Sequence, residues 1–268
     1  MLVRVRTDDN GPVKGACPLQ FHEKSFAGDG KDRLTPVGPR APASTILRIE
    51  IMGSYQPDAF NPLETIRTIH ECAPIYRDRL LERHVLFIPS GGEAPLETFY
   101  AADNFMHLCG LNYPGMSARE FWDRAISGRL PSNGIRRNNG GTVAKGRVLP
   151  TLVRIDAKAI MMVRNPRLPG NTKADAICAN LPCVLGYTNR GGILRPCTAL
   201  EMPSERLSDV KNIIMVVKTE PRLKTYGTVS KQPKKRDAAK RQGVRRSLKL
   251  YEGGCCIDFD AVDATFRQ

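Results

Sequence analysis

The pattern of apolar residues changes near Pro150, and this change restricts the fold more than any other feature of the sequence. Before Pro150, apolar residues recur at the spacing of amphipathic helices. After it, short apolar segments are separated by Gly, Asn and Pro, which predicts a meander of antiparallel strands. The predicted strands are 151–155, 177–187, 192–200, 213–218 and 225–229. Helices first and strands afterwards indicate an α+β fold rather than alternating βαβ units.

Start and stop signals place three helices in the first half of the chain. The first has the capping pattern Asn61-Pro62-Leu63-Glu64 and should kink or end at Pro74. The second is predicted over 96–109, and the third begins at the capping box Ser117-Ala118-Arg119-Glu120. A short apolar run, 84–88, predicts a strand between the first two helices.

The composition divides the chain into three parts. Gly, Pro, Asp and Lys interrupt residues 1–58 so often that no period is maintained, except for a short alternation at 46–51. We therefore predict an irregular N-terminal arm (1–58), an α+β domain (59–230) and a basic C-terminal extension (231–268). In the α+β domain, we expect the N-terminal helices to pack on a small antiparallel sheet.

Half of the formal net charge lies near the C-terminus. The formal net charge is +14, and the segment 234–249 carries eight basic residues and one acid, a net charge of +7. This density indicates contact with a polyanion such as the backbone of RNA or DNA, and a solvated surface segment is the alternative. The basic residues of the segment are Lys234, Lys235, Arg236, Lys240, Arg241, Arg245, Arg246 and Lys249.

Other classes of protein are not supported by the sequence. No stretch approaches the roughly 18 consecutive apolar residues of a membrane-spanning helix, so we expect no membrane partner. Charged residues within Met1–Asp9 interrupt any export signal, so we expect a cytoplasmic protein with cysteine thiols. The cysteines and histidines lack the usual metal-ligand spacings, and no glycine-rich phosphate loop occurs, so we expect no metal and no cofactor. A zinc site formed by Cys178, Cys183 and Cys197 stays open as an alternative.

A series of short motifs follows the chain from about residue 97 to about residue 230. The motifs are Asn104-Phe105-Met106-His107-Leu108-Cys109-Gly110, Ser117–Trp122, Gly128-Arg129-Leu130, Lys145 with Leu149, Val184–Tyr187, Arg195–Thr198 and Tyr226. In this order they resemble the phage-associated nuclease toxins of the barnase, EndoU, colicin and RelE-like superfamily. The resemblance implies a helical half that packs on a small antiparallel sheet, one face of which binds RNA.

Cleavage of RNA without a metal has definite chemical requirements. A base must take the proton of the 2′-hydroxyl, an acid must protonate the leaving 5′-oxygen, and cations must stabilise the phosphate. Histidine suits proton transfer near neutral pH, tyrosine and lysine serve when their pKa values are shifted, and arginine can bind phosphate through two hydrogen bonds.

Residues of these types occur within the motifs. The candidates for catalysis, which we expect around one concave face, are His107, Lys145, Arg195, Thr198 and Tyr226. The further candidates for nucleic-acid contact are Arg136, Arg137 and Lys224. Each of these residues also has a structural interpretation, as a half-buried histidine, a surface cation, a turn residue or a packing tyrosine.

The resemblance implies a metal-independent endoribonuclease. Such an enzyme would leave a 2′,3′-cyclic phosphate and a 5′-hydroxyl, with RNA as its partner and an antitoxin or immunity protein as a second one. The residues alone also fit a non-catalytic basic nucleic-acid-binding protein. A toxin that transfers ADP-ribosyl or nucleotidyl groups is a third, weaker hypothesis.

Overall fold

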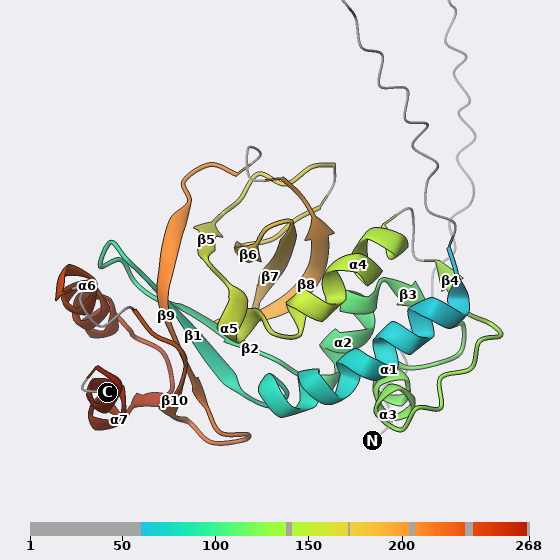
Figure 1. Cartoon of the computed structure of the whole chain (residues 1–268), viewed down its shortest axis with the longest axis horizontal. Helices are drawn as coiled ribbons and strands as arrows, with labels where there is room; N and C mark the ends of the chain where they lie inside the picture. Colours follow the sequence, from blue (N-terminus) through green and yellow to red (C-terminus); the bar gives the residue numbers. More distant parts are fainter. Residues whose placement is uncertain (1–59, 138–140, 171, 204–206, 234–237, 267–268) are drawn as a thin grey trace, which may run out of the picture. The chain divides into compact units, whose positions relative to one another are not determined.

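The computed structural model describes residues 60–137, 141–170, 172–203, 207–233 and 238–266, which belong to one compact unit, Tyr55–Gln268 (Figure 1). The predicted arm (1–58), with its predicted strand 46–51, lies outside the described residues. The same is true of the predicted nucleic-acid contacts Lys234, Lys235 and Arg236.

Two predicted helix starts are confirmed. Helix α1 (Pro62–Arg79) begins after Asn61, whose side-chain oxygen accepts hydrogen bonds from two N–H groups of the first turn. Helix α3 (Ala118–Ile126) begins after Ser117, whose hydroxyl oxygen accepts a hydrogen bond from the N–H of Glu120. Both caps satisfy donors that the first helical turn cannot pair by itself.

The predicted helix 96–109 is divided in the structure. Its first residues form strand β2 (Leu96–Phe99), and helix α2 (Ala102–Cys109) follows. Leu96 and Thr98 are fully buried, whereas Glu97 and Phe99 are half-buried. Alternate residues are therefore buried, as is typical of a strand with one covered face. The helix ends at Gly110, whose positive φ of 68° is the left-handed conformation that glycine adopts most easily.

The predicted strand 151–155 is helical instead. It forms the end of α4 (Thr142–Leu152) and the start of α5 (Ile155–Lys158). Leu152, Val153 and Ile155 are fully buried, and helical turns bury them as completely as a strand would. A proline inside the helix does not prevent this, because Pro150 lies inside α4 just as Pro74 lies inside α1.

Nine strands of the described residues form one mixed sheet, in the order β1-β2-β8-β7-β6-β5-β9-β10-β11. Their bounds are β1 His84–Pro89, β2 Leu96–Phe99, β5 Met161–Arg164, β6 Ala176–Asn180, β7 Cys183–Arg190, β8 Ile193–Glu201, β9 Lys211–Thr219, β10 Thr225–Lys231 and β11 Cys256–Ile257. A separate pair consists of β3 (Leu111–Asn112) and β4 (Arg136–Arg137).

The prediction of a small antiparallel sheet is therefore wrong. Strands β1 and β2 lie between helices in the sequence, yet they join the later strands, and β1 also pairs with β9. The ladder of hydrogen bonds consequently closes on itself from β1 round to β9. Most pairs are antiparallel, whereas β2 pairs with β8 and β10 pairs with β11 in parallel.

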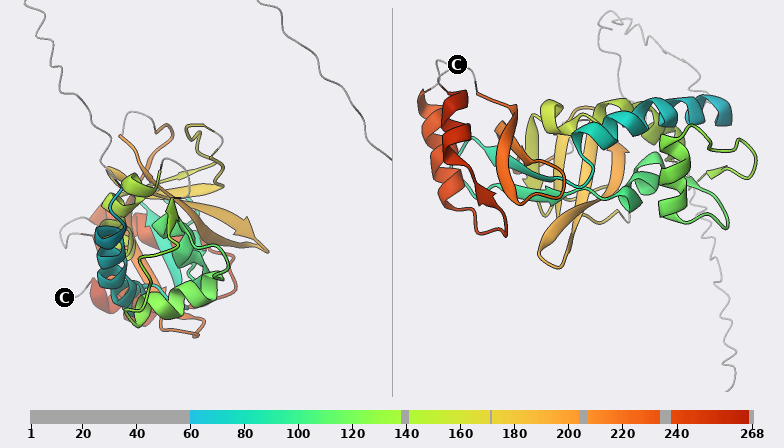
Figure 2. Two further views of the ribbon diagram at one scale, coloured as in Figure 1. Left: turned by 90° about the vertical axis from the view of Figure 1, so that its right-hand side faces the viewer. Right: turned by 90° about the horizontal axis from the view of Figure 1, so that it is seen from below.

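Helices cover both faces of the sheet around β1 and β9 (Figures 1 and 2). Helices α1–α5 pack on one face, where Val85 and Phe87 of β1 point. Helices α6 (Ala238–Lys249) and α7 (Phe259–Thr265) pack on the other face, against Leu86 and Ile88. The segment predicted as a basic C-terminal extension thus contributes packed elements, and Val244 and Leu248 of α6 are buried in this second core.

No described helix is long and apolar enough to cross a membrane. The cysteines that the structure describes are all free thiols.

Candidate active site

Five side chains meet on the face of the sheet opposite α1–α5, the face against which α6 and α7 pack. We call His84, Glu97, Tyr226, Tyr251 and Cys255 the Glu97 cluster. Strand β1 supplies the histidine, β2 the glutamate and β10 the first tyrosine, and the segment between α6 and β11 supplies the other two. Because alternate residues of a strand point to opposite faces, the register that buries Val85 and Phe87 under the helices turns His84 to this side.

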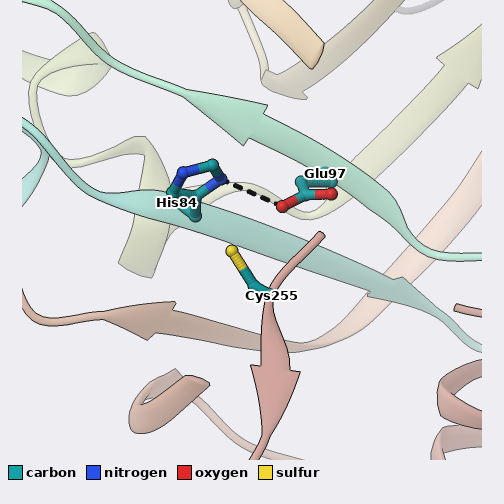
Figure 3. Close-up of side chains that lie close together, drawn as sticks. All are labelled: His84, Glu97 and Cys255. Carbon is teal, nitrogen blue, oxygen red and sulfur yellow. Dashed lines mark hydrogen bonds and ion pairs between the residues drawn. The ribbon is translucent and has the colours of Figure 1, made fainter. Parts of the chain in front are cut away.

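The carboxylate of Glu97 is the centre of the cluster. Nδ1 of His84 lies 3.0 Å from Oε1 of Glu97 (Figure 3). The hydroxyl of Tyr226 donates to the same oxygen at 2.9 Å. The hydroxyl of Tyr251 accepts a hydrogen bond from the N–H of Cys255 at 3.2 Å, and its ring packs edge-on against Tyr226. The side chains of His84 and Glu97 are only 13% and 14% exposed, so water screens their interaction weakly.

Burial would raise the pKa of Glu97, but hydrogen bonds from His84, Tyr226 and Tyr251 outweigh it and hold the pKa below its usual value. Burial and the adjacent carboxylate raise the pKa of Tyr226, and burial raises the pKa of Cys255 to about 11. Near neutral pH the cluster therefore holds one carboxylate, protonated phenols and a thiol. An ionised carboxylate only accepts hydrogen bonds, so we assign the proton to Nδ1 of His84, which leaves Nε2 as the basic nitrogen.

A cleft of about 550 Å³ reaches the cluster. Glu97 and Tyr251 line it together with polar residues from β5, β7 and the neighbouring loops. A side chain at Gly253 would collide with Oε2 of Glu97 and the hydroxyl of Tyr251, so only glycine lets the chain pass this close to the carboxylate. Arg164, at the end of β5, donates to the carbonyl oxygens of Ala94 and Pro95, just before β2.

Arg195 of β8 lies beside the cluster. Its guanidinium is 5.4 Å from the ring centre of Phe99, and that ring is 4.9 Å from the imidazole of His84. Nε of Arg195 is buried and has no hydrogen-bond partner among the described residues. The guanidinium therefore packs on Phe99, one ring away from the histidine, and its Nε is shielded from solvent.

The structure does not bring the five predicted catalytic residues together at one place. Tyr226 lies in the Glu97 cluster, with Arg195 nearby. His107 is exposed on α2, on the side of the sheet that α1–α5 cover, and its carbonyl oxygen accepts a hydrogen bond of 3.2 Å from Nζ of Lys145 on α4. Burial lowers the pKa of Lys145. Thr198 of β8 is half-buried, and its methyl group fills the space that a side chain on Gly186 would take.

The predicted nucleic-acid contacts are distributed over several elements. Arg136 and Arg137 are exposed on β4, and Lys224 is exposed just before β10. Helix α6 carries the remaining described ones, of which Arg241 is half-buried and the others are exposed: Lys240, Arg245 and Arg246. Arg245 also forms an ion pair with Asp263 of α7.

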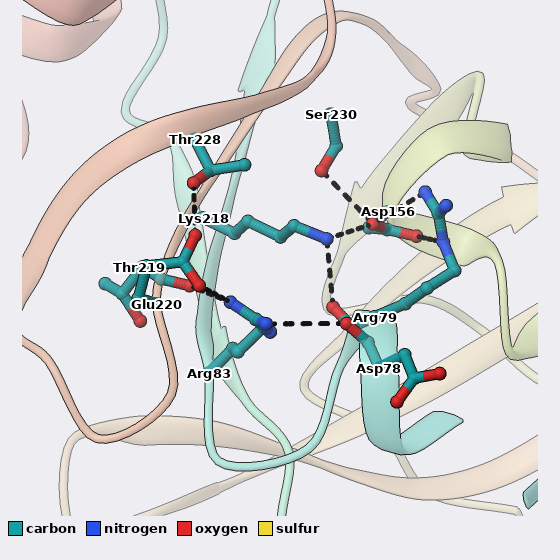
Figure 4. Close-up of polar contacts among 9 residues, drawn as sticks. All are labelled: Asp78, Arg79, Arg83, Asp156, Lys218, Thr219, Glu220, Thr228 and Ser230. Atoms are coloured by element: carbon teal, nitrogen blue, oxygen red, sulfur yellow. Dashed lines mark hydrogen bonds and ion pairs between the residues drawn. The ribbon is translucent and has the colours of Figure 1, made fainter. Parts of the chain in front are cut away.

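A second polar cluster surrounds Asp156 of α5 (Figure 4). Its two carboxylate oxygens accept hydrogen bonds from Arg79 at 2.9 Å each, from Lys218 at 3.0 Å and from Ser230 at 3.1 Å. Asp156 is completely buried, so solvent does not reach its carboxylate. This cluster joins α1, α5, β9 and β10, and we interpret it as structural.

Four residues of the Glu97 cluster were not predicted as site residues. Glu97 falls in the segment predicted to be helical, and His84 is the first residue of the predicted strand 84–88, where it was not singled out. Tyr251 and Cys255 come from the predicted extension. Residues 96–99 (Leu-Glu-Thr-Phe) do not alternate between apolar and polar, so the sequence held no period-two signal that could have placed Glu97 on a strand.

Residues 68–240 match the model of a family described as phage-Barnase-EndoU-ColicinE5/D-RelE like nuclease4. The chain belongs to this nuclease family. Comparisons of the nuclease with curated proteins and with solved structures give no match. The matched segment includes His84, Glu97 and Tyr226, whereas Tyr251 and Cys255 follow it. The resemblance predicted from the sequence motifs is thus confirmed.

Proposed function

We propose that this nuclease is a metal-independent endoribonuclease and that the Glu97 cluster is its catalytic centre. The observation that carries the proposal is the hydrogen bond between the ionised Glu97 and Nδ1 of His84 beside a cleft. A carboxylate in this position fixes the orientation of the imidazole and stabilises the imidazolium that forms when Nε2 takes a proton.

The proposed reaction begins at the 2′-hydroxyl of the nucleotide before the scissile bond. Nε2 of His84 takes the hydroxyl proton as the 2′-oxygen attacks phosphorus. The bond from phosphorus to the 5′-oxygen then breaks, and this oxygen needs a proton. Tyr251 lines the cleft, and burial raises its pKa, so it carries a proton near neutral pH and is our candidate for the acid. The products are a 2′,3′-cyclic phosphate and a 5′-hydroxyl.

Cations stabilise the charge that grows on the phosphate. Arg195 is our candidate, because its guanidinium packs on Phe99, whose ring lies beside the imidazole of His84. Exposed Arg246 and Lys249 on α6 lie just before Tyr251 in the chain, so this helix can bind phosphates that flank the cleft.

The test uses a DNA oligonucleotide that contains a single ribonucleotide, incubated with the full chain in excess EDTA. We expect a single cut on the 3′ side of the ribonucleotide, with a 2′,3′-cyclic phosphate and a 5′-hydroxyl as the new ends, and no cut in an all-DNA control. Cleavage of the control, or cleavage that requires added Mg²⁺, would contradict the proposal.

A non-catalytic nucleic-acid-binding protein is the second candidate function. The exposed basic residues of α6 favour it, because they provide phosphate contacts without any chemistry. Tight, salt-dependent binding of RNA without cleavage under any tested condition would support this function over the first.

A further inference from the structure

We propose that His84, Glu97 and Cys255 form a binding site for a zinc ion, and that the bound ion inhibits the nuclease reversibly. The first half of this proposal stands on the geometry of the three side chains. The second half rests on the proposed function, because it requires His84 to act as the base.

The three side chains offer the ligand types that zinc prefers. An imidazole nitrogen, a carboxylate oxygen and a sulfur atom, one from each residue, all lie within 4.8 Å of one another (Figure 3). Zinc bonds of about 2.0–2.3 Å in a tetrahedral arrangement put ligand atoms about 3.3–3.7 Å apart. Small side-chain movements therefore suffice to bring all three atoms onto one ion, and the fourth position stays open.

The charges also match. A Zn²⁺ ion with one carboxylate and one thiolate is electrically neutral, which suits a site where His84 and Glu97 are mostly buried and Cys255 is only 6% exposed. Binding releases the proton of the Cys255 thiol to solvent, and the metal takes the place of that proton. The hydroxyl of Tyr226 can continue to donate to Glu97, as an outer hydrogen bond to a carboxylate ligand commonly does.

Zinc at this position would prevent His84 from acting as the base in the proposed reaction. The ion occupies Nδ1 of His84, so the proton of the neutral ring moves to Nε2, where it prevents the ring from accepting another. The ion also replaces the hydrogen bond between His84 and Glu97. The reaction therefore proceeds best in a chelator, and added zinc stops it.

The binding test uses Co²⁺, whose absorption spectrum reports tetrahedral geometry and thiolate ligation, on the full reduced chain. We expect intense visible bands and a near-ultraviolet thiolate-to-cobalt band, both removed by a stoichiometric amount of Zn²⁺. Cys255→Ser should abolish the thiolate band and lower zinc affinity, measured by calorimetry, by at least about tenfold. Cys256→Ser is the matched control, because Cys256 is the adjacent and exposed cysteine, and it should change neither quantity. Absence of the thiolate band, or its persistence in Cys255→Ser, would overturn the metal site.

The inhibition test measures the cleavage rate of each variant in free Zn²⁺ and compares it with the rate of the same variant in EDTA. We expect zinc to stop the wild type, EDTA to restore it, and Cys255→Ser to lose less of its rate at the same zinc concentration. Zinc that binds through Cys255 but leaves cleavage unchanged would overturn the inhibition and place the reaction elsewhere. If no variant cleaves RNA under any condition, the proposed function and the inhibition fail, whereas the cobalt spectrum still decides the metal site.

Discussion

Replacement of Asp156 by alanine tests whether the buried polar cluster around this residue stabilises the fold. The carboxylate accepts four hydrogen bonds at 2.9–3.1 Å, two from Arg79 and one each from Lys218 and Ser230. Arg79 is 34% exposed and can turn to water, but the side chain of Lys218 is only 9% exposed. The variant therefore leaves a buried ammonium group without its counter-charge.

Breaking a buried ion pair from one side costs about 3–5 kcal/mol, because the remaining charge is uncompensated. With a urea dependence of about 2 kcal/mol/M, the midpoint of unfolding should fall by about 1.5–2.5 M. Asp123→Ala is the control, because Asp123 pairs with Arg119 at a side-chain exposure of 57%, and it should cost less than about 1 kcal/mol.

A double-mutant cycle with Lys218→Met separates the interaction energy between Asp156 and Lys218 from the other effects of each substitution on stability. Removal of the remaining ammonium should recover part of the loss, so the double variant should be more stable than the sum of the two single losses predicts, by about 1–3 kcal/mol. Additive losses in urea unfolding, or a loss below about 1 kcal/mol for Asp156→Ala, would refute the role that we assign to this cluster.

Three further predictions concern the proposed site and its surroundings. Because the folded-state pKa of Glu97 lies below its unfolded value of about 4.3, this group stabilises the fold above that pH and loses its contribution as the pH falls through the folded pKa. Glu97→Gln should therefore flatten the fall of the unfolding free energy between about pH 5 and pH 3, and an unchanged slope would contradict this. Gly253→Ala should lower stability by about 1–3 kcal/mol in urea unfolding and slow cleavage, whereas Gly254→Ala, with open space around it, should do neither. Arg246→Glu combined with Lys249→Glu should weaken RNA binding and reduce the salt slope by about 0.7 per lost contact, as measured by anisotropy titrations, with little change in the rate at saturating RNA.

Local signals predicted two helix starts and the strands β1, β8, β9 and β10 closely, but they misassigned residues 96–99 and 151–155. The caps at Asn61 and Ser117 depend on neighbouring residues only, and both are confirmed. Strand β2 has four residues, and its apolar positions also fit a helix, so its pairing with β1 decides its structure. The closed ladder through β1 and β9 joins segments more than 120 residues apart, which no local pattern indicates.

The site shows the same limit. Tyr226 was predicted as a catalytic candidate, and it lies in the Glu97 cluster. Its partners His84 and Glu97 meet because the register of β1 and β2 turns both to one face, and Tyr251 enters only because α6 packs on that face. Sequence motifs indicated the family, whereas the three-dimensional pairing of strands determined which polar side chains meet.

Single-turnover cleavage of RNA in EDTA, with His84→Ala compared with His107→Ala, tests the central claim most directly. Both variants remove an imidazole, and RNA binding and unfolding measured alongside confirm that each variant is folded and saturated. We predict that His84→Ala lowers the cleavage rate by at least about 100-fold, as loss of a general base does, and that His107→Ala stays within about threefold of the wild type. The reverse result, with full activity in His84→Ala and a large loss in His107→Ala, would contradict the claim and place the catalytic centre on the sheet face that α1–α5 cover.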